Sequence, residues 1–304
     1  MAFVFLAHIF LFMKVFIVGA SGLLGSNCQK HFSEMGWEVK GSYFSYPTPE
    51  TVFYDTLNPE HTDNFDIVSY KPDVIVHCGA LTHVDYCETH EDESYLKTVQ
   101  STINLAAIAD KCKAKMVYIS TDYVFDGKHG PYEEDEKVNP ISIYGRHKLE
   151  AEQYVLNTIP NSLVLRVTNV YGNEIRGKNF IARIIDQCIN NQKLTLKLPY
   201  DQYASPTNAW DIARAMHVLL RDGKHGIYHT GGTDYMNRVE LALRVLQYFP
   251  DAEYELYPMS TKQLQQPAPR PLLGGFVKRK FSNEYPDFLF GNVDSYLKEV
   301  LQTI

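Results

Sequence analysis

The sequence predicts an α/β protein with a Rossmann-like, doubly wound parallel sheet and a smaller C-terminal substrate-binding lobe. Short β-branched runs alternate with longer runs of helical period between residues 14 and 167, which is typical of a parallel sheet covered on both faces. A glycine-rich turn follows the first of these runs. After Gly172 the alternation weakens, and a Pro- and Gly-rich stretch at 265–275 has no periodicity.

The predicted strands and helices follow one another in regular alternation, and each helix is long enough to connect two parallel strands. In the first half, strands are expected at Lys14–Val18, Glu38–Ser42, Val74–His77, Met116–Ser120 and Leu163–Val167, and helices near Leu23–Met35, Ser94–Ala109 and Ser142–Leu156. In the second half, a strand is expected near Gly226–Thr230, and helices near Phe180–Asn190, Asn208–Arg221, Arg238–Tyr248 and Val293–Leu301.

These elements predict two units. Residues 13–172, with returning segments near 200–232, are expected to form a dinucleotide-binding domain, and residues 173–304 mainly the substrate-binding lobe. Residues 1–12 are almost wholly apolar but have neither the basic flank nor the cleavage site of a signal peptide. We interpret them as an extension or a mis-assigned start before Met13, with an interfacial anchor as the alternative.

The composition narrows the classes of partner. The chain has 304 residues, 45% of them apolar, and a net charge of −7 with scattered basic residues. Binding a nucleic acid requires clustered basic residues, so no nucleic-acid partner is expected, and no apolar run predicts a membrane span. The five cysteines form no Cys-x-x-Cys pair and the histidines show no metal spacing. Reduced thiols in a cytoplasmic protein and no metal site are therefore expected.

The glycine-rich turn follows the first predicted strand and opens a helix. Its sequence, VGASGLLG, has the spacing G-x-x-G-x-x-G. Glycines permit a tight turn and let backbone N–H groups approach a pyrophosphate, to which the helix N-terminus adds positive charge. An ordinary strand-to-helix turn is the alternative, but strand, helix and position together favour dinucleotide binding. The expected contacts are Gly19, Ser21, Gly22, Leu23, Leu24 and Gly25.

The residues after the second predicted strand bear on the choice of cofactor. An acidic residue there would bind the ribose 2′-hydroxyl and favour NAD, but the segment GSYFSYPTP at 41–49 has none. The polar Ser42 and Tyr43 lie where a 2′-phosphate would bind. NADP(H) is therefore favoured as the cofactor, and NAD(H) is the alternative.

Tyr144 and Lys148 lie four residues apart in a predicted helix and so project from one face. A ketone that receives hydride needs a proton, which a phenol can donate, and a neighbouring ammonium stabilises the phenolate. The same spacing also arises by chance on surface helices. Here, however, the pair follows the glycine-rich turn and a strand that ends in Ser120–Thr121, where a hydroxyl can bond a substrate carbonyl.

Several motifs resemble those of the extended short-chain dehydrogenase/reductases, and among these the dTDP-4-dehydrorhamnose reductase family. They are STDYVFDG at 120–127, YGRHKLEAE at 144–152, RVTNVYG at 166–172 and the pair Arg270–Pro271. The resemblance runs from Met13 to near the C-terminus. It implies that Thr121, Tyr144 and Lys148 form the catalytic trio, the last two also contacting the cofactor. It further implies cofactor contacts from Asp55, Gly79, Ala80 and Thr82, and substrate contacts from Thr121, Tyr123 and Arg270.

The activity that this resemblance implies is NAD(P)H-dependent reduction of a 4-keto group on a nucleotide-activated deoxysugar. Related 4,6-dehydratases have an acidic residue where this chain has Tyr123, so dehydration lacks its acid/base group. The alternatives are an NAD-dependent nucleotide-sugar epimerase and a non-catalytic, cofactor-binding regulatory subunit. The expected partner is a small-molecule nucleotide sugar, and a homodimer is left open.

Two arginines and two departures from the family pattern complete the sequence analysis. Arg166, at a predicted strand end, is expected to be a structural ion-pair partner. Arg270, in the Pro-rich loop, is expected to be free to meet a diphosphate, because a guanidinium fits phosphate oxygens. Thr98 stands where the family often has an Asn that assists proton relay, and Ala204 where Gly is common. These departures leave the identity of the substrate open.

Overall fold

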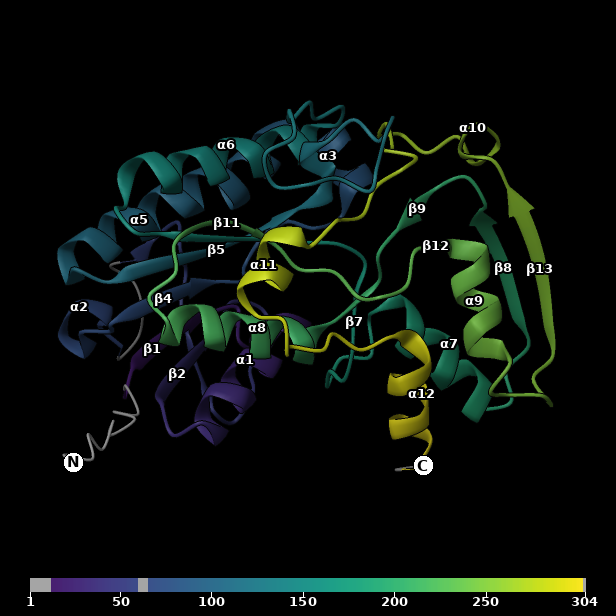
Figure 1. Ribbon diagram of the computed structural model, residues 1–304, viewed down its shortest axis with the longest axis horizontal. Coiled ribbons are helices and arrows are strands. Elements are labelled where there is room, and N and C mark those ends of the chain that lie inside the picture. The colour runs from purple at the N-terminus through teal and green to yellow at the C-terminus, as the bar shows by residue number, and fades with distance from the viewer. Residues whose placement is uncertain (1–11, 60–64, 303–304) are drawn as a thin grey trace, which may run out of the picture.

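The computed structural model describes residues 12–59 and 65–302. Its centre is a parallel seven-stranded sheet with helices on both faces (Figure 1). The strand order is β11-β6-β5-β4-β1-β2-β3, so the direction in which the sheet grows reverses between β1 and β4. Ligands bind at such a switch point, beyond the carboxyl ends of the strands. The predicted fold class is confirmed.

The central strands β1, β4, β5 and β6 of this sheet are buried on both faces. In β1, Val15 and Ile17 pack into one hydrophobic core, while Phe16 and Val18 pack into the other. Double burial explains why these strands are continuous apolar runs in the sequence. The strands are β1 (Lys14–Val18), β2 (Glu38–Tyr43), β3 (Thr51–Phe53), β4 (Val74–His77), β5 (Lys115–Thr121), β6 (Leu163–Val167) and β11 (Gly226–His229).

Helices α1 (Leu23–Glu34) and α8 (Ala209–Arg221) cover one face of the sheet. The other face is covered by α2 (Ile67–Tyr70), α5 (Ser101–Cys112) and α6 (Ile143–Thr158). The short helices α3 (Val84–Thr89) and α4 (Glu91–Tyr95) precede α5.

The prediction of one continuous helix over Ser94–Ala109 is wrong. The chain forms α4, then a π-helical turn at Leu96–Gln100, and then α5. A π-helical turn bonds residue i to i+5 and so inserts an extra residue into the helix. A search for a 3.6-residue period does not detect such an insertion.

The smaller lobe has its own core, formed by α7 (Phe180–Ile189), α9 (Arg238–Leu246) and α12 (Val293–Leu301). Beside these helices, β8 (Leu194–Pro199) pairs in parallel with β13 (Tyr254–Met259) (Figure 1). Both strands were missed in the sequence. In β8, leucines at 194, 196 and 198 alternate with polar residues in the two-residue period of a strand, whereas β13 is mostly exposed and shows no such alternation. The remaining elements are β7 (Val170–Tyr171), β9 (Tyr203–Ala204), β10 (Thr207–Asn208), β12 (Met236–Asn237), α10 (Thr261–Leu264) and α11 (Arg279–Glu284).

The interpretation of residues 1–12 stays a prediction, because residues 1–11 lie outside the described residues. Over 12–59 and 65–302, no helix combines the length and the apolar character that crossing a membrane requires. Over the same ranges, no group of three or more His, Cys, Asp or Glu residues is placed to hold a metal ion.

Candidate functional site

The glycine-rich turn between β1 and α1 brings backbone segments closer than side chains would allow. Gly19 has a φ of +82°, and a Cβ there would lie 3.0 Å from the Gly79 nitrogen. A Cβ on Gly25 would lie 2.3 Å from the Gly19 carbonyl oxygen. A Cβ on Gly22 would lie 3.4 Å from the same oxygen, which is an ordinary van der Waals contact. The tight shape of the turn therefore depends on glycine at positions 19 and 25.

The first turn of α1 has no side-chain cap, because its N-cap residue is Gly22. The first backbone N–H groups of a helix have no intrahelical partner, and the helix dipole adds positive charge at this end. Leu23, Leu24 and Gly25 form this first turn. The turn is thus suited to bind a phosphate group.

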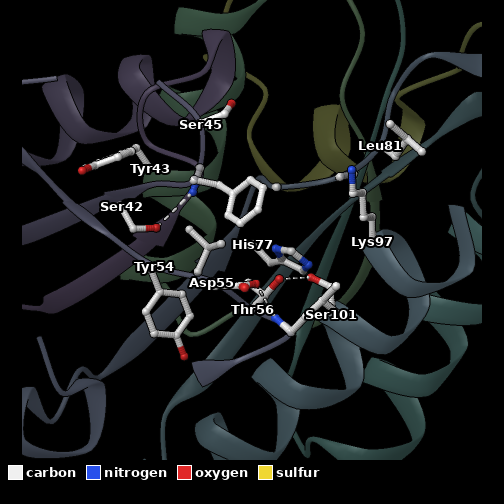
Figure 2. A pocket seen from close by; sticks show the side chains of 16 residues that line it. Ser42, Tyr43, Ser45, Tyr54, Asp55, Thr56, His77, Leu81, Lys97 and Ser101 are labelled. Carbon is white, nitrogen blue, oxygen red and sulfur yellow. Dashed lines mark hydrogen bonds between the residues drawn. The ribbon is translucent and has the colours of Figure 1, made fainter. Parts of the chain in front are cut away.

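A cavity of about 270 Å³ opens beside the turn, at the carboxyl ends of β1, β2 and β4 (Figure 2). The Ser42 hydroxyl points at the turn and accepts a hydrogen bond from the Gly19 N–H at 3.4 Å (Figure 2). The Asp55 carboxylate accepts hydrogen bonds from the Leu57 N–H at 2.9 Å and the Asn58 amide at 2.8 Å. The predicted cofactor contacts that line this cavity are Gly19, Ser42, Tyr43, Asp55, Gly79 and Ala80.

Ser21 and Thr82 are among the predicted cofactor contacts that do not line this cavity. Ser21 lines a neighbouring hollow of about 830 Å³, together with Gln29 and Lys30 of α1. Thr82 is exposed in the loop before α3 and does not line the cavity beside the turn. Six of the fourteen predicted cofactor contacts therefore line one cavity. Of the others, Gly22, Leu23, Leu24 and Gly25 belong to the start of α1, and Tyr144 and Lys148 belong to α6.

His77, the last residue of β4, lines the cavity but was not identified from the sequence. It is 1% exposed, and within the described residues neither ring nitrogen has a hydrogen-bond partner. Burial, followed by the charge of Lys148, lowers the pKa of His77 to about 3, so the ring is neutral near pH 7. The signal that could have found it is a polar residue at the ligand edge of an apolar strand.

The π-helical turn and α5 contribute Lys97 and Ser101 to the same cavity (Figure 2). The Ser101 hydroxyl donates to Thr56 Oγ1 at 2.8 Å, while Lys97 is paired with Glu93 at 2.5 Å. Between them, Thr98 is 1% exposed, and its hydroxyl has no hydrogen-bond partner in the described part of the chain. Lys97 and Ser101 were missed in the sequence, because the π-helical turn that positions them was predicted as part of a continuous helix.

Thr121 ends β5, and Tyr144 lies in the first turn of α6. The Thr121 hydroxyl donates to Asp122 Oδ1 at 3.3 Å and accepts from the Tyr123 N–H at 3.2 Å. Burial raises the pKa of the Tyr144 phenol, and a hydrogen bond with Thr121 acts in the opposite direction. Thr121 and Tyr144 are thus brought together, and the phenol is held in its protonated form.

Lys148 lies one helical turn after Tyr144 and is 4% exposed. Its ammonium donates to the Ile119 carbonyl at 2.5 Å and lies 4.1 Å from the ring centre of Tyr118. Burial lowers the pKa of Lys148 to about 7, and the Glu152 carboxylate opposes this effect. Its charge also acts on His77, so Lys148 connects α6 electrostatically to the cavity.

Tyr123 packs edge-on against Tyr144, with ring centres 5.4 Å apart. The neighbouring Asp122 is buried, and its carboxylate accepts from the Thr168 hydroxyl at 2.6 Å and the Gly275 N–H at 3.1 Å. Burial raises the pKa of Asp122. These hydrogen bonds connect the end of β5 to the loop at Gly275. They restrict the position of Asp122 and therefore of its neighbour Tyr123.

The predicted role of Arg166 as a structural ion-pair partner is confirmed. Its guanidinium donates two hydrogen bonds to the Glu152 carboxylate of α6, with lengths of 2.6 Å and 3.1 Å. The two side chains are 3% and 1% exposed. The pair connects β6 to the helix that carries Tyr144 and Lys148, which stabilises the position of that helix.

Arg270 was expected to be free to meet a diphosphate; it is instead paired with a carboxylate, and its contact with the substrate stays a prediction. Its guanidinium is paired with Asp85 of α3 at 2.8 Å, and its side chain is 7% exposed. Asp85 also accepts a hydrogen bond from the Ala268 N–H at 3.1 Å. The Pro-rich loop folds back onto α3 because pairing offsets the cost of burying the charge.

The assembled site has three parts with distinct chemistry. The glycine-rich turn and the start of α1 form a cradle that any larger side chain would fill and that suits a dinucleotide pyrophosphate. Thr121 and Tyr144 offer hydroxyl groups to a carbonyl oxygen, and Lys148 offers a buried ammonium. Together these groups can protonate a carbonyl as it is reduced.

Comparison with known proteins agrees with this arrangement. The family model described as RmlD substrate binding domain matches residues 13–301. The chain is 32% identical over 263 residues to methionine adenosyltransferase 2 subunit beta of Xenopus laevis, covering 85% of this chain and 78% of the relative. It is 30% identical over 259 residues to the spore coat polysaccharide biosynthesis protein SpsK of Bacillus subtilis, covering 85% and 87%. A solved dTDP-4-dehydrorhamnose reductase of Bacillus anthracis in complex with NADP matches with a TM-score of 0.81 and 25% identity, covering 97% and 100%.

Proposed function

This chain belongs to the RmlD substrate binding domain family, and we propose on that basis that it is an NAD(P)H-dependent oxidoreductase that reduces the 4-keto group of a nucleotide-activated deoxysugar. The observation that supports the proposal is the hydrogen bond between Thr121 and Tyr144, with Lys148 one helical turn later and its charge acting on His77 of the cavity beside the glycine-rich turn. A reductase needs a proton donor near its dinucleotide, and the Tyr144 phenol is our candidate for that donor.

The roles of the residues follow from their geometry. A bound reduced nicotinamide supplies hydride to the carbonyl carbon of the substrate. The Thr121 hydroxyl orients the carbonyl oxygen, and the Tyr144 phenol donates its proton to that oxygen as negative charge develops. The Lys148 ammonium stabilises the resulting phenolate, because an opposite charge nearby favours the ionised form.

The cofactor is proposed to be NADP(H), with NAD(H) as the alternative. The lining of the cavity at the end of β2 includes Ser42 and Tyr43 and no carboxylate from that strand. The Asp55 carboxylate, which also lines the cavity, is bonded within its own turn. The solved Bacillus anthracis reductase has NADP bound, which supports the same choice.

The proposal is tested by replacing the phenol of Tyr144. We expect Tyr144→Phe to keep its affinity for NADPH but to lose roughly 10²- to 10⁴-fold in turnover, the usual contribution of general acid catalysis. The assay is oxidation of NADPH and NADH with a panel of keto sugar nucleotides. Tyr154→Phe is the matched control, because Tyr154 lies on the same helix and packs in the core. A Tyr144→Phe variant that reduces the keto sugar at an undiminished rate would refute the proposal.

A regulatory subunit is the second candidate. It is favoured by the relatives named methionine adenosyltransferase 2 subunit beta, which match most of both chains. This candidate predicts NADPH binding without NADPH oxidation, and co-purification with a methionine adenosyltransferase catalytic chain. Net NADPH consumption in the panel assay separates reduction from both this role and epimerisation, in which hydride returns to the same substrate.

Location and assembly belong to the same proposal. All five cysteines are free, which agrees with a reducing compartment, and we propose the cytoplasm. We also propose a homodimer, which light scattering of the purified chain tests directly.

A further inference from the structure

Glu152 is a buried carboxylate of α6 that the proposed mechanism does not use. It lies four residues after Lys148, so the two side chains project from one face of the helix, with their Cβ atoms about 5–6 Å apart. Glu152 is 1% exposed and Lys148 is 4% exposed. A carboxylate and an ammonium are therefore neighbours on the face of α6 that packs against the sheet, away from solvent.

The two side chains connect α6 to adjacent strands of the sheet. Lys148 Nζ donates to the Ile119 carbonyl of β5 at 2.5 Å. Glu152 accepts hydrogen bonds of 2.6 Å and 3.1 Å from Arg166 of β6. Arg166 pairs in register with Ser120, the residue after Ile119. The two contacts thus lie at the same level of the sheet, which fixes the Glu152 carboxylate beside the Lys148 ammonium.

His229, the last residue of β11, holds the guanidinium of Arg166 in place. Arg166 Nη1 lies 3.2 Å from His229 Nε2, and His229 Nδ1 lies 3.0 Å from the Tyr132 carbonyl oxygen. Burial, followed by the charge of Arg166, lowers the pKa of His229 to about 3, so the ring is neutral near pH 7. A neutral ring that donates from Nδ1 to the carbonyl accepts at Nε2 from the guanidinium. Arg166 is therefore fixed in its position on Glu152.

The charge of Lys148 is influenced by groups that it does not touch. Within residues 12–59 and 65–302 it forms no ion pair, and its ammonium contacts the Ile119 carbonyl and the ring of Tyr118. Burial lowers the pKa of Lys148 to about 7, and Glu152 is the first group that opposes this effect. The titratable groups around Lys148 and the start of α6 are His77 and Cys78 at the end of β4, Cys87 and Glu88 of α3, Tyr118 of β5, Arg166 of β6, and Tyr144 and Glu152 of α6. Among these groups, Glu152 is the buried carboxylate.

We propose that Glu152, held in place by Arg166 and His229, is a positioning residue of the reductase site that keeps Lys148 charged beside Tyr144. This inference rests on the proposed function and adds the group that maintains the charge on which the phenolate depends. An opposite charge close to a buried ammonium favours its protonated form. Without Glu152, Lys148 becomes neutral at a lower pH, and a neutral amine does not stabilise the phenolate of Tyr144.

The first test measures proton binding by Lys148 directly and needs no turnover. The full-length chain is prepared with lysine that is isotope-labelled at Cε, and its NMR signals are followed as pH is changed. Lys148→Met identifies the Lys148 signal. We expect the titration midpoint of Lys148 to move to lower pH in Glu152→Gln. Glu150→Gln is the matched control, because Glu150 lies on the same helix but is exposed. Solvent screens its charge, so the midpoint stays unchanged.

The second test is the pH dependence of reductase turnover. From a midpoint near pH 7, proton binding that is tenfold weaker leaves about tenfold less ammonium at pH 8 but only about twofold less at pH 6. We therefore expect kcat of Glu152→Gln to fall about tenfold at pH 8 and about twofold at pH 6, with little change in KM for NADPH. A merely structural role of Glu152 lowers kcat by the same factor at both pH values.

Two further variants guard against loss of folding in Glu152→Gln, where Arg166 is left unpaired. Glu152→Asp keeps the charge, so we expect it to restore much of the wild-type pH profile. The double variant Glu152→Leu, Arg166→Met removes both charges. Its Lys148 midpoint is expected to fall less than in Glu152→Gln, because no unpaired guanidinium remains. Thermal unfolding of each variant shows that the chain is folded.

The outcomes separate this inference from the proposed function. A Lys148 midpoint that is the same in the wild type, Glu152→Gln and the double variant overturns the inference. A loss of turnover in Glu152→Gln that is equal at pH 6 and pH 8 overturns it as well. A lower midpoint in Glu152→Gln, in a chain whose wild type reduces no keto sugar, supports the role of Glu152 and refutes the proposed function.

Discussion

Replacing Lys148 by Met is expected to stabilise the folded chain while it removes turnover. Lys148 is 4% exposed, and burial lowers its pKa to about 7 from an ordinary value of 10.5. A pKa difference of one corresponds to about 1.4 kcal/mol. Charging this lysine in the folded state therefore costs about 5 kcal/mol at pH 6, where it is protonated in both the folded and the unfolded chain.

The free-energy cost of burying Lys148 depends on pH, because the folded chain binds the lysine proton less tightly than the unfolded chain does. The unfolded chain keeps the lysine charged up to about pH 10.5, whereas the folded chain releases the proton near pH 7. Stability of the wild type therefore rises with pH through this window. At pH 9 the cost is about 2 kcal/mol, and above pH 10.5 it disappears. Lys148→Met also loses the hydrogen bond to the Ile119 carbonyl, which reduces its gain in free energy of unfolding by about 1 kcal/mol.

The assay is urea unfolding of the cofactor-free chain, followed by tryptophan fluorescence at pH 6, 7.5 and 9. We expect the free energy of unfolding of Lys148→Met to exceed that of the wild type by about 4 kcal/mol at pH 6 and by about 1 kcal/mol at pH 9. Lys111→Met, on the exposed side of α5, is the control and shows no such gap. A Lys148→Met variant that is no more stable than the wild type at pH 6, or whose advantage does not shrink as pH rises, refutes the reasoning.

Two further substitutions test the scaffold of the site. Glu152→Ala leaves the guanidinium of Arg166 buried at 3% exposure without its carboxylate, so we expect the free energy of unfolding to fall by about 3–5 kcal/mol. The double variant Glu152→Leu, Arg166→Met should lose less in the same urea titration, and an equal or larger loss would contradict the argument. Gly25→Ala would place a Cβ 2.3 Å from the Gly19 carbonyl oxygen, so the turn must open and NADPH affinity, measured by fluorescence titration, should fall at least about tenfold. In Gly22→Ala the added Cβ would lie 3.4 Å from the same oxygen, so this variant should lose less NADPH affinity. A larger loss in Gly22→Ala than in Gly25→Ala would show that the close approach at Gly25 is unimportant.

Short-range patterns were sufficient for the centre of the sheet. The predicted bounds of β1, β4 and β6 match the structure residue for residue, because a central parallel strand is buried on both faces and forms an unbroken apolar run. Strand β13 was missed because most of it is exposed, whereas its partner β8 carries an alternation of leucines that indicates a strand and was overlooked. The short edge strand β3 was missed as well; its three residues are too few to show a period.

The sequence by itself determined the parts of the site whose residues are neighbours in the chain. The glycine spacing that forms the turn, and the four-residue spacing of Tyr144 and Lys148, are local properties that a strand-to-helix turn and a helix translate directly into geometry. The tertiary structure alone decided how the arginines around the site are paired. Asp85 meets Arg270, and Arg238 is left with Asn169, through contacts between segments far apart in the chain. Whether a buried charge is paired depends on such contacts, and no local spacing encodes them.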